Sequence, residues 1–246
     1  PHPVDEEGIV LNERPCDYYY VTPGHQVPTG VAMSSARRRQ LLEHAARHDA
    51  VIIEDDYDSE SNFTLNPLPA LKASDRSGRV VYVSSLSKAL SPGLRLGFMV
   101  ADPDLIDEAR ALRRLVYRHP PTNIQYQMAH FLAQGHYETH LRRYHYDSAQ
   151  RWERLHAALQ RYLPSCRALA GSEHANAFWL QTPAQINTQQ LTWRAAHAGV
   201  LIEPGARHFL NAAPPDNYFR MGFHAINPDA IAQGVEVLRG QLEQMG

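Results

Sequence analysis

In the first hundred residues, short apolar runs of strand length alternate with segments of helical periodicity. The apolar runs predict buried strands at residues 17–21, 49–53, 80–84 and 96–101. Helical periodicity predicts a helix at residues 36–48, with Ser34 or Ser35 as its N-terminal cap. Nearly continuous apolar strands that are separated by helices or long loops indicate an α/β sheet covered on both faces.

The pattern changes in the second half of the chain. Three helices are predicted at residues 105–117, 124–133 and 137–162, and the two prolines of residues 119–121 break the first from the second. Beyond them the pattern predicts strands at residues 177–181, 199–202 and 218–223, and helices at residues 188–198 and 228–244. We therefore expect two domains, residues 1–140 with the sheet and residues 141–246 as a smaller α+β unit.

Composition narrows the class of protein. The chain has 246 residues, of which 43% are hydrophobic and 20% charged, and these values exclude a disordered or fibrous chain. The net charge of −2 gives no bulk field for nucleic acid or membrane, and no apolar run reaches the length of a membrane span. Only Cys16 and Cys166 are cysteines, which supports neither a disulfide framework nor a cysteine-based zinc site.

Lysine is rare in this chain: of 24 lysine and arginine residues, only Lys72 and Lys88 are lysines. Lys88 follows a predicted strand in the segment Ser85-Leu-Ser-Lys88, seven residues before Arg95. Serine hydroxyls and a guanidinium can hold a phosphate dianion, and a partly desolvated lysine amine can form an imine, which arginine cannot. Taken alone, the segment fits a phosphate cofactor and a serine-rich loop with one solvated lysine equally well.

A second candidate is the acidic run Glu54-Asp-Asp-Tyr57-Asp-Ser-Glu60 at the end of a predicted strand. A carboxylate there can keep a pyridine nitrogen protonated, and a tyrosine two residues later can reach a ring hydroxyl. The run also imitates the start of a calcium loop. However, Ser61 stands where that loop needs glycine and Pro67 where it needs glutamate, so calcium is excluded.

Other polar clusters carry less information. The turn Thr22-Pro-Gly-His-Gln-Val-Pro-Thr-Gly30 does not match a nucleotide P-loop, because its glycine spacing differs and no lysine–serine/threonine pair follows. Histidine pairs at positions i and i+4 have no third ligand, so we predict no metal site. The arginine run at residues 37–39 opens a helix and is expected to be solvated or at a subunit contact.

The three segments together resemble fold-type I pyridoxal-phosphate enzymes, the aminotransferase superfamily. His25-Gln-Val-Pro-Thr-Gly30, Glu54-Asp-Asp-Tyr-Asp-Ser-Glu60 and Ser85-Leu-Ser-Lys88 with Arg95 are most similar to the aminotransferase-like domain of MocR-type (GntR family) transcription regulators. Residues 131–135, 140–143 and 151 also look like that subfamily. The resemblance implies a type I pyridoxal-phosphate transferase fold. Residues 1–140 would then be the C-terminal part of the large, mostly parallel domain, and residues 141–246 the small domain.

The resemblance also implies residue roles. Lys88 would form the Schiff base with pyridoxal 5'-phosphate, Asp55 would pair with the pyridinium nitrogen, and Tyr57 would contact the ring O3′. The phosphate would be bound by Ser85, Ser87 and Arg95. Arg220, in a predicted strand of the small domain, would hold a substrate carboxylate; the alternative is a surface arginine.

The sequence departs from the common family pattern at two places. Aminotransferases have an asparagine before Pro-Thr-Gly, and here that position is Val27, so His25 or Gln26 would take over its contact with O3′. In addition, the family's large domain begins well before Pro1. We therefore expect this chain to be the back part of a longer protein, in which any DNA contact passes through a domain that is absent here.

Three functions remain open from the sequence. The first is a regulator's effector domain, in which the Schiff base on Lys88 senses the cofactor or an amino compound. The second is an aminotransferase acting on an amino acid, and the third is a remnant that binds no cofactor. The resemblance implies a cytoplasmic homodimer that does not contact membranes.

Overall fold

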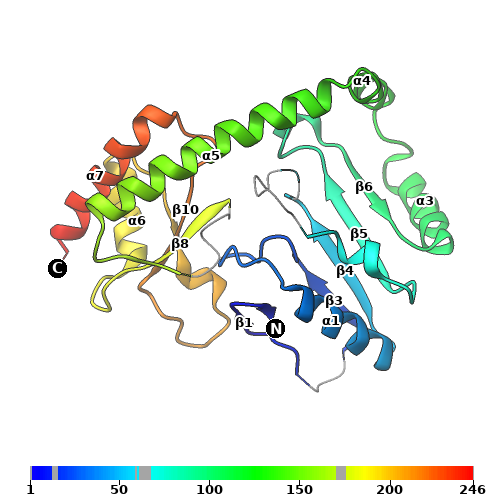
Figure 1. Ribbon diagram of the computed structural model, residues 1–246, viewed down its shortest axis with the longest axis horizontal. Coiled ribbons are helices and arrows are strands. Elements are labelled where there is room, and N and C mark those ends of the chain that lie inside the picture. Colours follow the sequence, from blue (N-terminus) through cyan, green and yellow to red (C-terminus); the bar gives the residue numbers. More distant parts are fainter. Residues whose placement is uncertain (1, 13–15, 59, 61–67, 170–175, 246) are drawn as a thin grey trace. The chain divides into compact units, whose positions relative to one another are not determined.

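A computed structural model describes residues 2–12, 16–58, 60, 68–169 and 176–245 (Figure 1). The chain divides into two compact units. The first, here called the sheet unit, comprises His2–Gln26 and Ala32–His145; the second, the C-terminal unit, comprises Val27–Val31 and the chain from Tyr146 onward. The assignment of residues 1–140 to the family's large domain and of residues 141–246 to its small domain stays a prediction.

The sheet unit is built on four strands in the order β3 (Tyr18–Val21), β4 (Val51–Asp56), β5 (Val80–Ser85) and β6 (Gly97–Val100). The first three are parallel, and β6 runs antiparallel to β5. Gly97 is required at the start of β6, since a Cβ there would lie 2.7 Å from the carbonyl oxygen of Ser84. The strands predicted from apolar runs are therefore confirmed, with small shifts at their ends.

Four of the five helices of the sheet unit follow the predicted order, and the short helix α2 (Leu71–Ser74) was not predicted. The five are α1 (Ser35–Arg47), α2, α3 (Pro103–Tyr117), α4 (Thr122–Ala133) and the first part of α5 (His136–Tyr162). A short hairpin, β1 (Val4–Asp5) with β2 (Gly8–Ile9), precedes the sheet, and a 3₁₀ turn, η2 (Pro92–Leu94), follows β5. Ser34 caps α1 by accepting a hydrogen bond from the Arg37 backbone N–H, as the sequence indicates.

The core of the sheet unit lies on one face of the sheet. Leu41 and Ala45 of α1 pack there with Ile52 of β4 and Val80 of β5, and all four are fully buried. Strand periodicity places β3 residues Tyr18 and Tyr20 on the opposite face, and both are exposed. On the same face of β4, however, Val51 and Ile53 are half-buried, so the expectation of a sheet covered on both faces stays a prediction.

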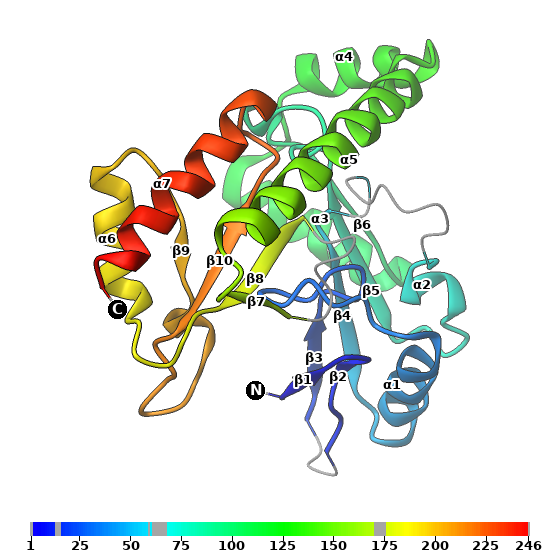
Figure 2. The ribbon, with the colours of Figure 1, turned by 60° about the vertical axis from the view of Figure 1, so that its left-hand side comes forward.

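The C-terminal unit contains an antiparallel sheet in the order β7 (Arg167–Ala168), β8 (Ala177–Gln181), β10 (Tyr218–Gly222) and β9 (Glu203–Pro204). Helices α6 (Thr188–His197) and α7 (Ile231–Glu243) lie beside each other on this sheet (Figures 1 and 2). Two 3₁₀ turns, η3 (Gly205–His208) and η4 (Pro228–Ala230), complete the unit.

One predicted strand of this unit is misplaced. Residues 199–202 were expected to be extended, but Gly199 has a φ of +85° and the strand β9 begins only at Glu203. A positive φ at a glycine just after a helix is the usual helix-ending geometry, and it displaces the strand toward the C-terminus. The apolar run Val200-Leu-Ile202 therefore lies between the turn at Gly199 and the strand β9.

The arginine run in α1 is not uniformly solvated. Arg38 is buried, and its guanidinium donates to the carbonyl oxygens of Met33 (2.9 Å), Pro69 (2.7 Å) and Pro23 (2.9 Å). The expectation of solvated or intersubunit arginines is thus wrong for Arg38. Its guanidinium ties the segments on both sides of the sheet unit's first helix to one point, because five fixed donors can satisfy several carbonyls at once.

Candidate functional site

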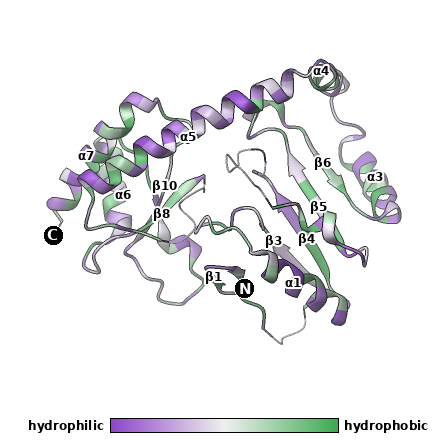
Figure 3. Cartoon of the chain, in the orientation of Figure 1, coloured by the Kyte–Doolittle hydropathy of each residue, from purple (hydrophilic) through white to green (hydrophobic). Residues whose placement is uncertain are grey.

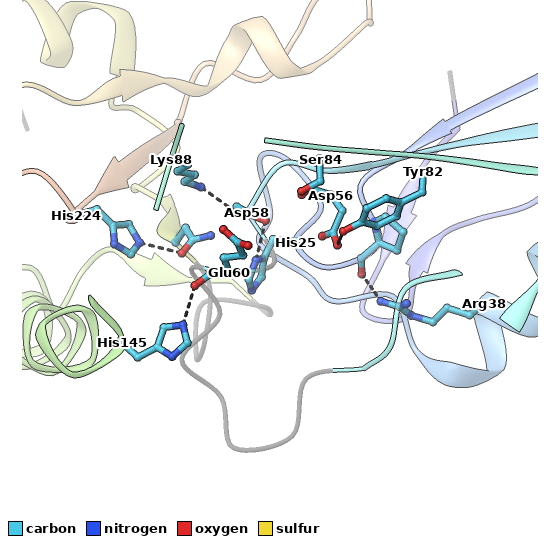
Figure 4. Close-up of polar contacts among 12 residues, drawn as sticks. His25, Arg38, Asp56, Asp58, Glu60, Tyr82, Ser84, Lys88, His145 and His224 are labelled. Atoms are coloured by element: carbon cyan, nitrogen blue, oxygen red, sulfur yellow. Dashed lines mark hydrogen bonds and ion pairs between the residues drawn. The ribbon is translucent and has the colours of Figure 1, made fainter. Parts of the chain in front are cut away.

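Lys88 lies in the loop that follows β5. The loop is held at its start by a hydrogen bond of 3.0 Å from the Leu86 N–H to the Leu96 carbonyl oxygen. The Lys88 amine lies 3.0 Å from Asp58 Oδ2 and 4.5 Å from the centre of the Tyr57 ring (Figure 4). The residue predicted to form the covalent bond is therefore brought against the acidic run, thirty positions earlier in the chain.

Asp58 is the buried centre of this group. Its side chain is 2% exposed, with Oδ2 facing Lys88 and Oδ1 lying 3.2 Å from His25 Nδ1. Burial alone would raise the pKa of Asp58, but the hydrogen bonds and charges of His25 and Lys88 outweigh it and lower that pKa to about 2. Asp58 is therefore ionised at neutral pH.

The acidic residues of β4 alternate between the two faces of the sheet. Asp55 accepts a hydrogen bond from the Tyr20 hydroxyl, and this bond, together with burial, raises the pKa of Tyr20 to about 12. On the other face, Asp56 accepts from the Tyr82 hydroxyl at 2.7 Å. Figure 3 shows the hydropathy of β4 changing from hydrophobic at its start to hydrophilic at its end, where these carboxylates gather.

Glu54 has a structural role. It is fully buried, and its two oxygens accept hydrogen bonds from the backbone N–H groups of Leu71 (2.7 Å) and Lys72 (2.9 Å) at the start of α2. Burial raises the pKa of Glu54, and the two backbone N–H groups oppose that effect. Glu54 thus fixes α2 to the sheet.

The predicted phosphate ligands lie around the lysine loop. The Ser87 N–H donates to Ser85 Oγ at 3.2 Å, which folds the Ser-Leu-Ser segment into a tight turn. Arg95 directly follows η2 and has a φ of +49°, in the left-handed region. The two serines are thus joined directly, whereas Arg95 follows on the same loop with no recorded contact to either of them.

Helix α1 holds the segment that contains His25 and Gln26 through a hydrogen bond from Arg38. Both side chains are buried, and Arg38 donates to the carbonyl oxygen of Pro23, two residues before His25. His25 faces Asp58, so the structure brings one of the two predicted cofactor residues of this turn into the lysine group.

The first part of α5 supports the same loops. His140 Nε2 lies 2.6 Å from the carbonyl oxygen of Ala89, the residue after Lys88, and His145 Nε2 lies 2.7 Å from the carbonyl oxygen of Glu60 (Figure 4). His140, which forms an i, i+4 pair with His136, therefore has a structural contact that fixes the lysine loop. Among the residues that the structure describes, no group of three His, Cys, Asp or Glu could hold a metal ion.

Arg220 belongs to the C-terminal unit. It lies on β10, and its guanidinium is 3.3 Å from Glu203 Oε2 on the neighbouring strand β9. Glu203 also pairs with Arg207 at 3.2 Å and lies 3.3 Å from His208. Arg220 is partly exposed, so a ligand carboxylate would compete with Glu203 for it.

Sequence reasoning missed Asp58 as a site residue. The motif that contains it was recognised, but its pairing with Lys88 is a tertiary contact between two loops and has no local pattern. The available signal was its position: an acidic residue directly after a buried strand, beside the tyrosine predicted to contact the ring, needs a partner when it is buried.

The fold agrees with what comparisons with known proteins show. Residues 21–238 match the family model Aminotransferase class I and II. In sequence, the chain is 38% identical over 236 residues to the HTH-type transcriptional regulator TauR of Rhodobacter capsulatus, covering 94% of this chain and 48% of that protein. It is 34% identical over 243 residues to the probable rhizopine catabolism regulatory protein MocR of Rhizobium meliloti, covering 97% and 49%.

Solved structures show the same architecture. A kynurenine aminotransferase of Pyrococcus horikoshii superposes with a TM-score of 0.89 at 26% identity, covering 99% of this chain and 63% of that one. LysN, an α-aminoadipate aminotransferase of Thermus thermophilus, superposes with a TM-score of 0.90 at 27% identity, covering 99% and 65%.

The chain belongs to the class I and II aminotransferase family. The predicted type I pyridoxal-phosphate transferase fold is confirmed, and so is the resemblance to MocR-type regulators. The chain spans about half the length of the curated relatives it matches. Across the described ranges, no helix is long and apolar enough to cross a membrane.

Proposed function

We propose that this chain is the pyridoxal-phosphate-binding, aminotransferase-like effector domain of a MocR-type transcription regulator. The observation that carries the proposal is the position of Lys88. Its amine lies over the Tyr57 ring and against Asp58, on a loop that also contains two serines and Arg95. The 38% and 34% identities to TauR and MocR support the regulator rather than the enzyme.

The donor set fits pyridoxal phosphate. The cofactor needs a primary amine for its aldehyde, a carboxylate for its ring nitrogen, and several donors for its phosphate dianion. Lys88 supplies the amine and Asp55, at the end of β4, the carboxylate. Ser85, Ser87 and Arg95 supply hydroxyl and guanidinium donors. Tyr57 and the buried His25–Gln26 segment would contact O3′.

Each residue then has a defined task. When bound, the cofactor supplies an aldehyde that reacts with amines and a ring that withdraws electrons. Lys88 fixes the cofactor covalently, and Asp55 keeps the ring nitrogen protonated by offering it a negative charge. Arg220 would hold the carboxylate of an amino-acid-like ligand through its planar guanidinium.

The second candidate is a working aminotransferase. It is favoured by the 30% identity over 237 residues to the 2-aminoadipate transaminase of Thermus thermophilus, of which the chain covers 58%. In that case Lys88 would also move a proton on the substrate. Both candidates use the same residues, and they differ in whether ligand turnover follows ligand binding.

The two lysines allow a matched test of cofactor attachment. Incubation with pyridoxal phosphate followed by borohydride reduction should attach one cofactor to the wild-type chain, located at Lys88 by peptide mass spectrometry. Lys88→Arg should lose both the absorbance band of the bound cofactor and the reduced adduct, since arginine forms no stable imine with an aldehyde. Lys72→Arg should keep both. No adduct on the wild-type chain, or an adduct on Lys72, would contradict the proposal.

A second measurement separates regulator from enzyme. Amino acids are added to the loaded chain, and the loss of the band is followed together with release of the corresponding oxo acid. A regulator should change its spectrum without releasing the oxo acid, whereas an aminotransferase should release one oxo acid per bound cofactor.

Three further expectations belong to the same proposal. We propose that the protein acts in the cytoplasm, that it forms a homodimer, and that it contacts DNA only through another domain.

A further inference from the structure

Asp58 differs from the other carboxylates of the acidic run in the partners of its side chain. Its neighbours Asp55 and Asp56 bond tyrosine hydroxyls, and Glu54 bonds backbone N–H groups, whereas Asp58 faces two basic side chains. The Lys88 side chain is 31% exposed, so a lysine that is partly accessible to solvent is joined to a buried anion.

The geometry has a direct consequence for the proton on Lys88. Asp58 is ionised at neutral pH, and a carboxylate 3.0 Å away favours the ammonium over the neutral amine. An ammonium has no lone pair, so it can neither bond to an aldehyde carbon nor accept a proton. The charged groups that act on Asp58 itself are His25 and Lys88.

We propose that Asp58, oriented by His25, is a positioning residue that holds the unbonded Lys88 amine as an ammonium and so restrains its reaction with aldehyde ligands. Bond formation then requires a defined order. The ammonium proton passes to solvent, the amine nitrogen bonds to the aldehyde carbon, and the carbonyl oxygen leaves as water. The identity of that aldehyde as pyridoxal phosphate rests on the proposed function, whereas the control of the proton does not.

The same arrangement suits a sensor. When an amino ligand displaces Lys88 from its covalent bond, the released amine returns to a neighbouring anion. Asp58 would keep it charged, and a charged Lys88 is a poor base. A domain built in this way binds and exchanges ligands while turnover is restrained, which deepens the proposal of an effector domain.

The two lysines make the proton state of Lys88 measurable without any cofactor. The wild-type chain is labelled with trace acetic anhydride over a pH series, and labelling of Lys88 and Lys72 is compared by peptide mass spectrometry. Asp58→Asn should shift the pH midpoint of Lys88 labelling downward by about one unit or more, which is about a tenfold rise in its rate near neutral pH. The midpoint of Lys72 should stay unchanged.

Two variants serve as controls. Asp107→Asn removes an exposed carboxylate from α3, where it pairs only with Arg110 in the contacts recorded, and should shift neither lysine. Asp58→Glu keeps the charge while disturbing the packing, and should keep the Lys88 midpoint near that of wild type. A role of Asp58 in packing alone would change the limiting rate of labelling at high pH without moving its midpoint.

If Asp58→Asn fails to fold, labelling of the wild-type chain in the folded and unfolded states still tests the proposal. The Lys88 midpoint in the folded chain should lie above its midpoint in urea, where the Asp58 contact is lost. A folded midpoint equal to or below the unfolded one would overturn the proposal, as would an unshifted midpoint in folded Asp58→Asn. Failure of the proposed function would give a different result: the wild-type chain would capture no pyridoxal phosphate, whatever the pH midpoint of Lys88 labelling.

Discussion

At the scale of single residues, the run from Glu54 to Asp58 gives each carboxylate a different environment. Strand alternation sends Glu54 and Asp56 to the face that bears the core and Asp55 to the opposite face. Asp58 comes after the strand has ended and turns into a buried contact with His25 and Lys88. Carboxylates within five positions therefore have different partners: backbone N–H groups for Glu54, a tyrosine hydroxyl for Asp55, and two basic side chains for Asp58.

The buried Asp58 predicts a measurable dependence of stability on pH. Its pKa in the folded chain is about 2, below the ordinary value of 3.8, so its contribution is complete above about pH 5 and is lost as the pH falls toward 2. The contribution is roughly 2 kcal/mol, from about two pKa units. Urea unfolding midpoints measured from pH 6 to pH 3 should fall less steeply for Asp58→Asn than for wild type. Equal slopes would contradict this assignment.

Glu54 offers a second test at this scale. Glu54→Ala removes the partner of two backbone N–H groups and leaves a cavity, so we expect a loss of about 3 kcal/mol in the free energy of unfolding. Glu54→Gln should cost less, because one oxygen remains to accept a hydrogen bond. The control is Glu43→Ala, an exposed residue on α1, for which urea unfolding should show a change within about 0.5 kcal/mol.

At the scale of elements, α1 organises the segment that leads into the site. Arg38 donates to three carbonyl oxygens from two segments outside the helix, and one of them belongs to the turn that contains His25. Arg38→Ala should therefore destabilise the chain by about 3 kcal/mol, because three carbonyls, those of Met33 and Pro23 in buried bonds, lose their charged donor. The adjacent and exposed Arg39 is the matched control, and Arg39→Ala should change the urea midpoint little. Similar losses for both variants would show that Arg38 does not act through these carbonyls.

The elements show how far the sequence alone could go. The apolar runs of β4 and β5 and the periodicity of α1 were sufficient to predict those elements, because local patterning and tertiary burial agree there. The motifs around Lys88, Asp55 and Tyr57 were readable for the same reason: each is a local segment at a strand end.

The remainder depended on contacts between distant segments. Arg38 resembles its neighbours Arg37 and Arg39 in sequence, and only the fold distinguishes the one whose donors meet three carbonyls. The pairing of Asp58 with Lys88 likewise joins two loops that no local pattern connects. The shifted strand β9 had another cause, since the left-handed Gly199 could have been assigned either to a turn or to a strand start.

At the scale of the whole molecule, the sheet unit carries exposed apolar surface. Helix α3 has no buried residue, and Leu112, Leu115, Val116 and Tyr117 are each more than 60% exposed. Clustered apolar surface of this kind favours association in water. Produced as these 246 residues alone, the chain should self-associate at micromolar concentration, as measured by light scattering.

Substitutions in the apolar surface of α3 test whether this surface causes the association. Leu112→Glu combined with Leu115→Glu should reduce the scattering by placing charges in the apolar cluster. Leu201→Glu is the control, because Leu201 of the C-terminal unit is 83% exposed but lies on another part of the chain. Equal reductions by both changes would show that α3 has no special part in association.

The partial exposure of the sheet face that bears Asp55 would also set the dielectric in which this carboxylate binds a ring nitrogen, if it does so as proposed. Asp55 and Tyr20 share that face, and Tyr20 is 65% exposed. A carboxylate and a cation 4 Å apart attract with about 1 kcal/mol in water but about 4 kcal/mol at an effective dielectric constant of 20. If Asp55 pairs with a protonated ring nitrogen as proposed, any segment that covers this face would strengthen that attraction by about 3 kcal/mol, without a change in any residue of the site. Cofactor affinity would then be set by solvent exclusion as much as by the ligating side chains.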